Sequence, residues 1–257
     1  MGDQVNSTRP ARFSPGLAPD WNGPLPEPGI RMADELRPVL ADPGCRYDGE
    51  MYYMYRDVAR PGPDAGWLRE QGIRYDITVI PPRDLCGEYI KTVGHYHPEN
   101  PEGAGYPEIY EVMKGRAHYL LQAHDLSQVI VVDAHAGDIV IVPPGFGHVT
   151  INPTKGTVLQ MANLVSSRFQ SDYREYEKRR GAAYYEMTTG EFLKNPSYPD
   201  VPPLKRVDAG KFRTVSSELG VPLYSMVEQR RDVLSILNHP ERYGSFFPEA
   251  PGTWTHG

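Results

Sequence analysis

The sequence predicts an all-β barrel that carries extensions at both ends. Between residues 78 and 165, short runs of strand-forming residues follow one another at nearly regular intervals, separated by turn residues, as is typical of barrels and sandwiches. No long helical pattern interrupts this region, which argues against a doubly wound α/β fold because such folds alternate strands with helices. The chain has 257 residues, enough to bury a full core.

The first 44 residues are predicted to form a proline-rich arm. They contain eight of the 26 prolines and five of the 25 glycines. We expect the arm to run extended over the barrel, with one short helix near Met32–Leu40. The alternative is a partly disordered tail, although Trp21 and its apolar neighbours indicate that at least part of the arm docks.

The strands of the predicted barrel begin near Gly49, and alternation and turn residues define each of them. One strand covers residues 75–80 and stops at Pro81-Pro82, because proline cannot donate to a strand ladder. The other predicted strands are 51–56, 88–97, 108–114, 117–123, 128–133, 138–142, 148–152 and 157–165.

After Val165 the pattern changes to short helices and loops. Residues 172–180 read as one helix, with Asp172 near its start and Gly181 as its stop, and residues 225–237 read as another that ends before Pro240. We interpret both as arms that pack on the barrel. The expected division is therefore a proline-rich arm (1–44), a barrel (45–170) and a C-terminal extension of helices and loops (171–257).

Charge and composition exclude several classes of protein. The net charge is -6 and the isoelectric point is near 5.8, without a basic stripe that would suit a nucleic acid. No apolar segment approaches 18 residues and no signal pattern is seen, so we expect no membrane partner. With only Cys45 and Cys86 we expect no disulfide framework and a reducing compartment. A cytoplasmic location is the corresponding expectation.

Three histidines and a glutamate form a candidate metal site. His95 and His97 are two residues apart in a predicted strand, so both imidazoles should lie on one face. Glu108 opens the next predicted strand, and His148 follows the Pro143–Gly147 turn. Three imidazoles with one carboxylate suit a borderline transition metal. The remaining histidines are interpreted as surface or satisfied core residues: His118, His124, His135, His239 and His256.

The spacing around these four residues resembles the two signature motifs of the cupins, which are small β-barrels with the metal inside. Gly115 follows Glu108, and the later motif runs from Gly137 through Pro143 and Gly145 to His148 and Asn152. The first motif departs from the common form because ten residues, 98–107, separate His97 from Glu108. This insertion is rich in turn residues and is expected to bulge from the mouth of the barrel.

Within the cupins, residues 50–175 resemble the metal-dependent glucose-6-phosphate isomerases. The resemblance lies in Thr92-x-Gly94-His95-Tyr96-His97, Glu108-Ile109-Tyr110, Lys114-Gly115, Leu120-Leu121-Gln122 and Val142-Pro143-Pro144. It implies one divalent metal per chain, with Fe2+ favoured and Mn2+, Ni2+, Co2+ or Zn2+ as other possibilities. It also implies a homodimer and a role in glycolysis or gluconeogenesis.

The same resemblance implies a set of substrate contacts. Thr92 and the Gly94 amide would contact the phosphate or nearby hydroxyls, joined by Tyr110. Tyr52 and Thr78 are equally consistent with ordinary barrel-lining residues. No compact Lys/Arg cluster lies near the motif in sequence; Lys91, Lys114 and Arg116 are the nearest cations, and backbone amides with hydroxyls can hold a phosphate without one.

The leading hypothesis is therefore a metal-dependent aldose–ketose isomerase that interconverts glucose 6-phosphate and fructose 6-phosphate. The metal would stabilise negative charge that develops on the substrate oxygens. Glu108 would carry the proton between carbons, or would only bind metal and shuttle hydroxyl protons during a hydride shift. The alternatives are a cupin isomerase or epimerase of another sugar or polyhydroxy acid, an Fe(II)-dependent cupin oxygenase, and a non-catalytic metal- or sugar-binding cupin.

Overall fold

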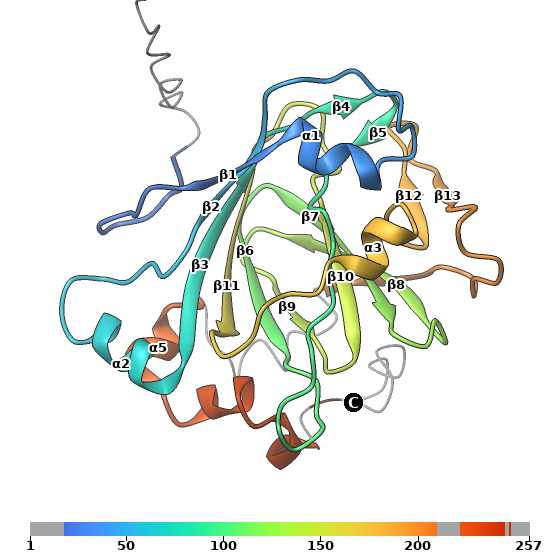
Figure 1. Cartoon of the computed structure of the whole chain (residues 1–257). Helices are drawn as coiled ribbons and strands as arrows, with labels where there is room; N and C mark the ends of the chain where they lie inside the picture. Colours follow the sequence, from blue (N-terminus) through green and yellow to red (C-terminus); the bar gives the residue numbers. More distant parts are fainter. Residues whose placement is uncertain (1–17, 210–221, 245–246, 248–257) are drawn as a thin grey trace, which may run out of the picture.

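Two facing sheets form the β-barrel in the computed structural model, which describes residues 18–209, 222–244 and 247 (Figure 1). The six-stranded sheet has the order β1-β2-β3-β11-β6-β9, and the four-stranded sheet has the order β10-β7-β8-β14. Strand bounds in the first sheet are β1 Gly29–Met32, β2 Glu50–Tyr55, β3 Ile73–Ile80, β11 Leu159–Ser166, β6 Glu108–Lys114 and β9 Ile139–Val142. In the second sheet they are β10 Phe146–Ile151, β7 Arg116–Ala123, β8 Val129–His135 and β14 Lys205–Asp208.

Strand register gives the six-stranded sheet a polar band on its inner face. β11 lies between β3 and β6, so Val165 pairs with Arg74 on one side and Glu108 on the other. Alternate residues of one strand share a face. The inner face therefore also carries Asp76 and Thr78 of β3, Tyr110 of β6 and Asn163 of β11, all of which line one cavity.

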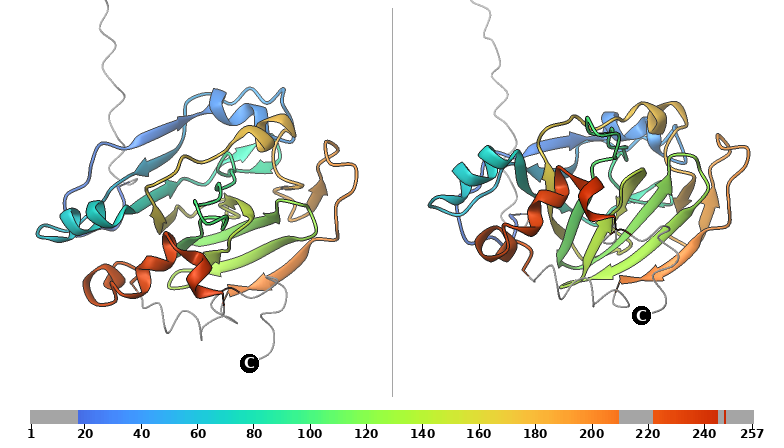
Figure 2. Two further views of the ribbon diagram at one scale, coloured as in Figure 1. Left: turned by 60° about the horizontal axis from the view of Figure 1, so that its bottom comes forward. Right: turned by 90° about the horizontal axis from the view of Figure 1, so that it is seen from below.

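Both sheets are also covered on their outer faces. Helix α5 (Ser225–Gln229) and the 3-10 turns η4 (Val233–Leu237) and η5 (Pro240–Tyr243) follow residue 221. Apolar residues of this segment, such as Leu223 and Ile236, share a core cluster with Ile77 and Leu164 of the six-stranded sheet. Figure 2 shows these red helices beside helix α2 (Asp64–Gln71) and that sheet. On the four-stranded sheet, Leu120 packs in a cluster with residues that follow β11.

Two of the predicted C-terminal helices are present in shortened form. Helix α3 covers Arg174–Lys178. The run 225–237 is not continuous but consists of α5 and η4, separated at residues 230–232. The sequence reading missed helix α2, the hairpin of β12 (Tyr184–Glu186) and β13 (Phe192–Lys194), and β14, which pairs parallel with β8.

The N-terminal arm contributes a strand to the barrel. β1 pairs antiparallel with β2 and forms an edge of the six-stranded sheet. The predicted short helix is confirmed as α1 (Ala33–Leu36) followed by η2 (Arg37–Val39). Trp21 docks as expected, with its ring centroid 5.6 Å from that of Tyr75 and 5.0 Å from that of Tyr224.

The predicted strand 88–97 is wrong for most of its length. Only Glu88–Tyr89 is a strand (β5), which pairs with β4 (Asp84–Leu85); beyond it the chain makes isolated bridges at Lys91, His95 and Tyr96. Gly94 interrupts the extended run with a φ of +85°. A Cβ at this position would lie 2.5 Å from Tyr176 and 2.6 Å from Val149, so close packing as well as conformation requires glycine here.

The expectation that the cysteines form no disulfide is corrected by the structure. Cys45 and Cys86 are joined by a disulfide bond between residues 41 positions apart. They meet because the β4–β5 hairpin, whose turn is Cys86-Gly87, folds against the segment that follows η2. Both turn residues have positive φ, 59° and 94°, as a two-residue hairpin turn of type I′ requires. A structural disulfide is more typical of an oxidising compartment.

Among the described helices, none combines the length and the apolar character that a bilayer crossing requires.

Candidate metal centre and substrate pocket

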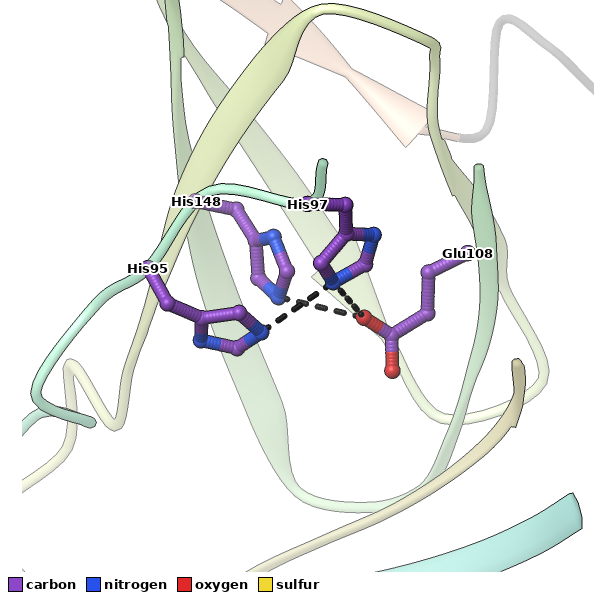
Figure 3. Close-up of side chains that lie close together, drawn as sticks. All are labelled: His95, His97, Glu108 and His148. Atoms are coloured by element: carbon purple, nitrogen blue, oxygen red, sulfur yellow. Dashed lines mark hydrogen bonds and ion pairs between the residues drawn. The ribbon is translucent and has the colours of Figure 1, made fainter. Parts of the chain in front are cut away.

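Four side chains converge at the inner end of the cavity, and we call them the histidine corner: His95, His97, Glu108 and His148 (Figure 3). The Nε2 atoms of His95 and His97 are 3.2 Å apart. The Oε2 atom of Glu108 lies 3.3 Å from Nε2 of His97 and 3.3 Å from Nε2 of His148. The sequence reading selected these four residues, and the fold brings them together.

Backbone pairing fixes the positions of three of these residues. His95 and His148 lie directly opposite each other, and each backbone N–H donates to the carbonyl of the other, at 3.3 and 3.1 Å. Glu108 is the first residue of β6 in the facing six-stranded sheet, where it pairs with Val165 and Val142. The turn before β10 includes Gly145 at a φ of +78°, which lets the chain return into the barrel at His148.

His97 is oriented by residues that the sequence reading did not select. Its Nδ1 lies 2.9 Å from the backbone carbonyl of Tyr106, so this nitrogen carries the proton and Nε2 keeps its lone pair for the corner. Phe169 packs on the imidazole with ring centroids 4.5 Å apart, and stacks on the Tyr106 ring at 4.7 Å. Tyr106 belongs to the 98–107 insertion, two residues before Glu108, and that proximity was the available signal.

The electrostatics of the corner favour neutral imidazoles beside an ionised carboxylate. Burial, together with the neighbouring His148 and His97, holds the pKa of His95 well below its usual value. Burial lowers the pKa of His148 to about 4, although the charge of Glu108 acts in the opposite direction. Burial alone would raise the pKa of Glu108, but His97 and His148 beside it bring that pKa below the usual value. At neutral pH His95, Glu108 and His148 are therefore in the state that binds a cation.

The geometry fits a transition metal. Ligands about 2.1 Å from a central ion lie about 3.0 Å apart at octahedral and about 3.4 Å apart at tetrahedral angles, and the distances of 3.2 and 3.3 Å fall within this range. The Oε2 atom of Glu108 is buried without a hydrogen bond, which is costly for a carboxylate unless a cation compensates. Histidine nitrogens with one carboxylate suit Fe2+, Mn2+, Co2+, Ni2+ or Zn2+.

The substrate-binding residues suggested by the sequence surround the corner in one cavity. The set consists of Tyr52, Thr78, Thr92, Gly94 and Tyr110, all of which line this cavity. The Tyr110 hydroxyl lies 3.0 Å from Nε2 of His148. The Thr92 hydroxyl oxygen accepts a hydrogen bond from the Thr150 N–H at 3.0 Å. Its own proton is therefore available for a further acceptor.

Three arginines in the same cavity were not found from the sequence, and we call them the arginine wall: Arg31, Arg56 and Arg74. They follow each other on or next to β1, β2 and β3, the strands at one side of the six-stranded sheet. The cations near the motif in sequence are used elsewhere: Lys91 pairs with Glu88 in the interior and Arg116 pairs with Asp133. Pairing between strands, and not proximity in the sequence, brings these positive charges together.

The 98–107 insertion is held in place by the C-terminal segment. The Asn100 amide donates to the Asn238 carbonyl at 3.3 Å and to Oε2 of Glu241 at 2.9 Å. The Asn100 side-chain oxygen accepts from the N–H groups of Glu102 and Ala104, at 3.1 and 2.9 Å. The insertion is therefore an ordered loop that connects the histidine corner to the C-terminal helices.

The histidines interpreted as ordinary residues include one clear example. His118 is buried, with Nδ1 2.8 Å from both carboxylate oxygens of Glu186, so it is a satisfied core histidine. His239 lies beside Glu241 near the surface. His256 lies outside the described residues.

With this geometry in view, the family assignment is clear. The sequence model of the family Glucose-6-phosphate isomerase (GPI) matches residues 30–203. The chain belongs to this family. The match runs from β1 to β13 and includes the histidine corner and the arginine wall, and the fold described above is an all-β cupin barrel.

Curated relatives carry the same family name. Glucose-6-phosphate isomerase from Thermococcus litoralis is 32% identical over 84 residues, and the protein from Pyrococcus abyssi is 29% identical over 84 residues. Each match covers 33% of this chain and 42% of the relative. The chain thus spans less than half the length of the curated glucose-6-phosphate isomerases it matches.

Similar solved structures include oxalate decarboxylases. Oxalate decarboxylase from Bacillus subtilis is 17% identical, with 48% of this chain and 28% of that chain covered and a TM-score of 0.35. A predicted oxalate decarboxylase from Thermotoga maritima is 19% identical, with 54% and 90% covered and a TM-score of 0.34.

Proposed function

We propose that this protein interconverts glucose 6-phosphate and fructose 6-phosphate with one divalent metal bound at the histidine corner. The observation that carries the proposal is the convergence, in one polar cavity, of three imidazoles and a buried carboxylate whose Oε2 atom has no hydrogen-bond partner among the described residues. Membership of the glucose-6-phosphate isomerase family supplies the reaction class. The proposal extends this family membership to activity, substrate and metal dependence.

His95, His97, Glu108 and His148 would hold the metal. A bound divalent ion would act as a Lewis acid for the oxygens on C1 and C2 of the sugar. The chain's own contribution is to hold the four ligand atoms in place, to keep His97 in one tautomer through Tyr106, and to bury the site from bulk water. Fe2+ is our favoured metal, with Mn2+, Ni2+, Co2+ and Zn2+ as the others that the ligand set accepts.

Glu108 is the catalytic residue in this proposal. Its carboxylate is 4% exposed, and its lowered pKa keeps it ionised at neutral pH. It can therefore accept the proton that leaves C2 or C1 and return it to the neighbouring carbon. In the rival route hydrogen moves as hydride between the carbons, and Glu108 exchanges only hydroxyl protons. Isomerisation in D2O separates the two, because only proton transfer through Glu108 can place solvent deuterium on carbon.

The remaining polar groups of the cavity would position the sugar phosphate. We propose hydroxyl contacts from Tyr52, Thr78 and Thr92, and a backbone contact from Gly94. Tyr110 lies next to His148 and Glu108, so it would contact a substrate oxygen near the reacting carbons. Burial, followed by the charge of Glu108, raises the pKa of Tyr110 well above its usual value, so its hydroxyl remains a proton donor.

A coupled assay of fructose 6-phosphate conversion to glucose 6-phosphate tests the function. Metal-stripped protein, protein reloaded with each metal separately, and the Glu108→Ala and His148→Ala variants would be compared. Turnover that returns with metal and is absent in both variants supports the proposal. Absence of turnover in folded, metal-loaded protein would contradict it. Assays with other sugar phosphates and of Fe2+-dependent oxygen uptake would then address the alternative cupin reactions.

We also propose a homodimer and a cytoplasmic location. β1 is an edge strand, with Ile30 37% and Met32 41% exposed, and such edges are suited to pairing with a second chain. Native mass spectrometry tests the proposed dimer.

Phosphorylated sugars cross membranes poorly because of their charge, which favours a location in the compartment where they are made. The Cys45–Cys86 disulfide argues against a reducing compartment such as the cytoplasm. A free-thiol assay on protein from its native cells distinguishes a reducing from an oxidising compartment.

A further inference from the structure

Arg31 occupies an unusual position at the rim of the cavity. It lies on β1 directly opposite Tyr52 of β2, so the two side chains share the inner face of the sheet. Its side chain is only 19% exposed and lines the same cavity as the histidine corner. The guanidinium carbon lies 5.9 Å from the ring centroids of both Tyr52 and Tyr173. A permanently charged group is therefore held between two aromatic rings, facing the cavity.

The hydrogen-bonding capacity of Arg31 is not used up by the protein. A guanidinium has five N–H donors. One terminal nitrogen donates to Oε1 of Glu35 at 2.8 Å, which fixes the orientation of the side chain. The Nε atom is buried and has no hydrogen-bond partner in the part of the chain that the structure describes. A buried N–H without an acceptor is costly, and a ligand oxygen in the cavity would relieve that cost.

The other two residues of the arginine wall are engaged differently. Nε of Arg74 donates to Oδ2 of Asp76 at 2.7 Å, and a terminal nitrogen of Arg56 lies 3.5 Å from the same oxygen. Asp76 is buried and so offsets one of these two positive charges. Arg31 therefore differs from the other two, because its Nε is a buried donor with no acceptor among the described residues.

The charges that line the cavity favour an anion. Arg31, Arg56 and Arg74 supply three positive charges, and Asp76 and Glu108 supply at most two negative ones. The whole chain has a net charge of -6, so this excess is local. A divalent metal at the corner would add two further positive charges, which makes the cavity strongly attractive to a dianion.

Tyr52 places Arg31 at the same end of the cavity as the Thr92–Gly94 segment. The Tyr52 hydroxyl accepts a hydrogen bond from the Val93 N–H at 3.4 Å. Burial raises the pKa of Tyr52, and the nearby Arg31 guanidinium opposes that change. Arg31, Tyr52 and the chain at residues 92–94 therefore surround one space in the cavity, which combines a free guanidinium N–H with hydroxyls.

We propose that Arg31 binds the phosphate group of the substrate and is the residue that selects phosphorylated over neutral sugars. This inference rests on the proposed function only for the identity of the sugar, since the donor geometry calls for a tetrahedral oxyanion carried by a polyhydroxy chain. The planar guanidinium would donate from Nε and one terminal nitrogen to two phosphate oxygens. Loss of such a charged pair of hydrogen bonds weakens binding by roughly 10- to 100-fold.

Binding of sorbitol 6-phosphate to the metal-loaded protein tests the inference, because this polyol phosphate has no carbonyl and is not isomerised. Calorimetry would give its dissociation constant for the wild type, Arg31→Ala, Arg31→Lys and the control Arg174→Ala. The control removes the same charge from an 86% exposed side chain that pairs with Asp172. Sorbitol would be titrated in parallel to measure the contribution of the hydroxyl chain alone.

We expect Arg31→Ala to weaken sorbitol 6-phosphate binding by roughly 10- to 100-fold, with sorbitol binding and the control unchanged. Arg31→Lys should recover part of the loss, because it keeps the charge but not the two parallel donors; it also serves if the alanine variant does not fold. If the protein isomerises fructose 6-phosphate, KM should rise by a similar factor while kcat changes little.

Each outcome bears on the inference separately from the proposed function. Arg31-dependent binding of sorbitol 6-phosphate without isomerase activity would leave the inference standing and overturn the proposed reaction. Isomerase activity with an unchanged KM in folded Arg31→Ala protein would overturn the inference and leave the reaction standing. Equal affinity of the wild type for sorbitol and sorbitol 6-phosphate would also overturn the inference.

Discussion

The histidine corner and the arginine wall face the same cavity but are built in opposite ways. The corner holds histidine nitrogens and one carboxylate, and the side chains of His97, Glu108 and His148 are nearly inaccessible. The wall holds permanent positive charges whose side chains are 19% to 43% exposed. The histidine corner is complementary to a permanently bound cation, and the arginine wall is complementary to an anionic ligand that exchanges with solvent.

Under the proposed function, this difference would let one cavity hold both ends of an asymmetric substrate. The corner is fixed by backbone pairing between His95 and His148, so its ligand atoms are placed before any ion binds. The wall is fixed by side-chain partners, with Glu35 for Arg31 and Asp76 for Arg74. Binding sites that are preorganised lose little entropy when the ligand arrives.

The largest expected effect comes from removing the charge of the corner. Glu108→Gln keeps the shape of the side chain but removes both the anionic ligand and the proton acceptor, so we expect turnover of fructose 6-phosphate to fall by at least ~10³-fold. Glu70→Gln on the exposed side of α2 is the matched control. Retention of more than a tenth of the activity by metal-loaded Glu108→Gln protein would contradict the role given to the corner.

The disulfide tests whether the arginine wall depends on its N-terminal support. A chemical cross-link across 41 positions restricts the unfolded chain, and a loop of this length corresponds to about 4 kcal/mol. We expect the double variant Cys45→Ser/Cys86→Ser to lose up to this amount in denaturant unfolding. Because β1 is also held by its pairing with β2, the KM for fructose 6-phosphate should change by less than about threefold. A large KM increase would show that the disulfide positions Arg31.

The pH dependence of the metal-free protein probes the corner alone. The pKa of His148 is lowered from 6.5 to about 4, so the unfolded chain binds a proton first as pH falls. The contribution of His148 to the free energy of unfolding should therefore be complete above pH 6.5. It should decline by on the order of 3 kcal/mol as the pH falls toward 4. His148→Gln should flatten the decline when both proteins are unfolded by urea at several pH values. Identical slopes would refute the prediction.

The smallest effect is expected from the aromatic support of His97. Phe169→Ala removes the ring that packs on this imidazole, and loss of such support typically weakens metal binding by roughly 10- to 100-fold. Competition with a colorimetric chelator measures the change. Phe192→Ala, whose ring lies near His118 with centroids 6.3 Å apart, is the control. Equal losses in both variants would indicate a general effect on the fold.

The histidine corner could be predicted because its chemistry is encoded at short range. Alternation placed most strands correctly, and the spacing of His95, His97, Glu108 and His148 identified the four residues that the fold brings together. The strand argument for residues 88–97 was incorrect, since that segment makes only isolated bridges beyond Tyr89. The imidazoles converge because the backbone of His95 pairs with that of His148 and because the Tyr106 carbonyl orients His97.

The arginine wall could not be predicted because its members are distant in sequence and each resembles an ordinary surface arginine. Only the order β1-β2-β3 brings Arg31, Arg56 and Arg74 to one surface. The Cys45–Cys86 bond was missed for the same reason, since two cysteines give no pattern. The parallel pairing of β14 with β8 depends on a long connection whose return path no local signal specifies.

The ordered insertion at residues 98–107 is positioned to affect the rate at which a metal would leave the histidine corner. It carries the Tyr106 carbonyl that orients His97, and Asn100 ties it to Asn238 and Glu241. Release of an ion bound at the corner would require His97 to turn away, and the docked loop holds this ring through the Tyr106 carbonyl. We therefore expect the residence time of the metal to follow the opening rate of the loop, which amide hydrogen exchange at Glu102 and Ala104 would measure. A metal that exchanges faster than these amides would show that the loop does not control its release.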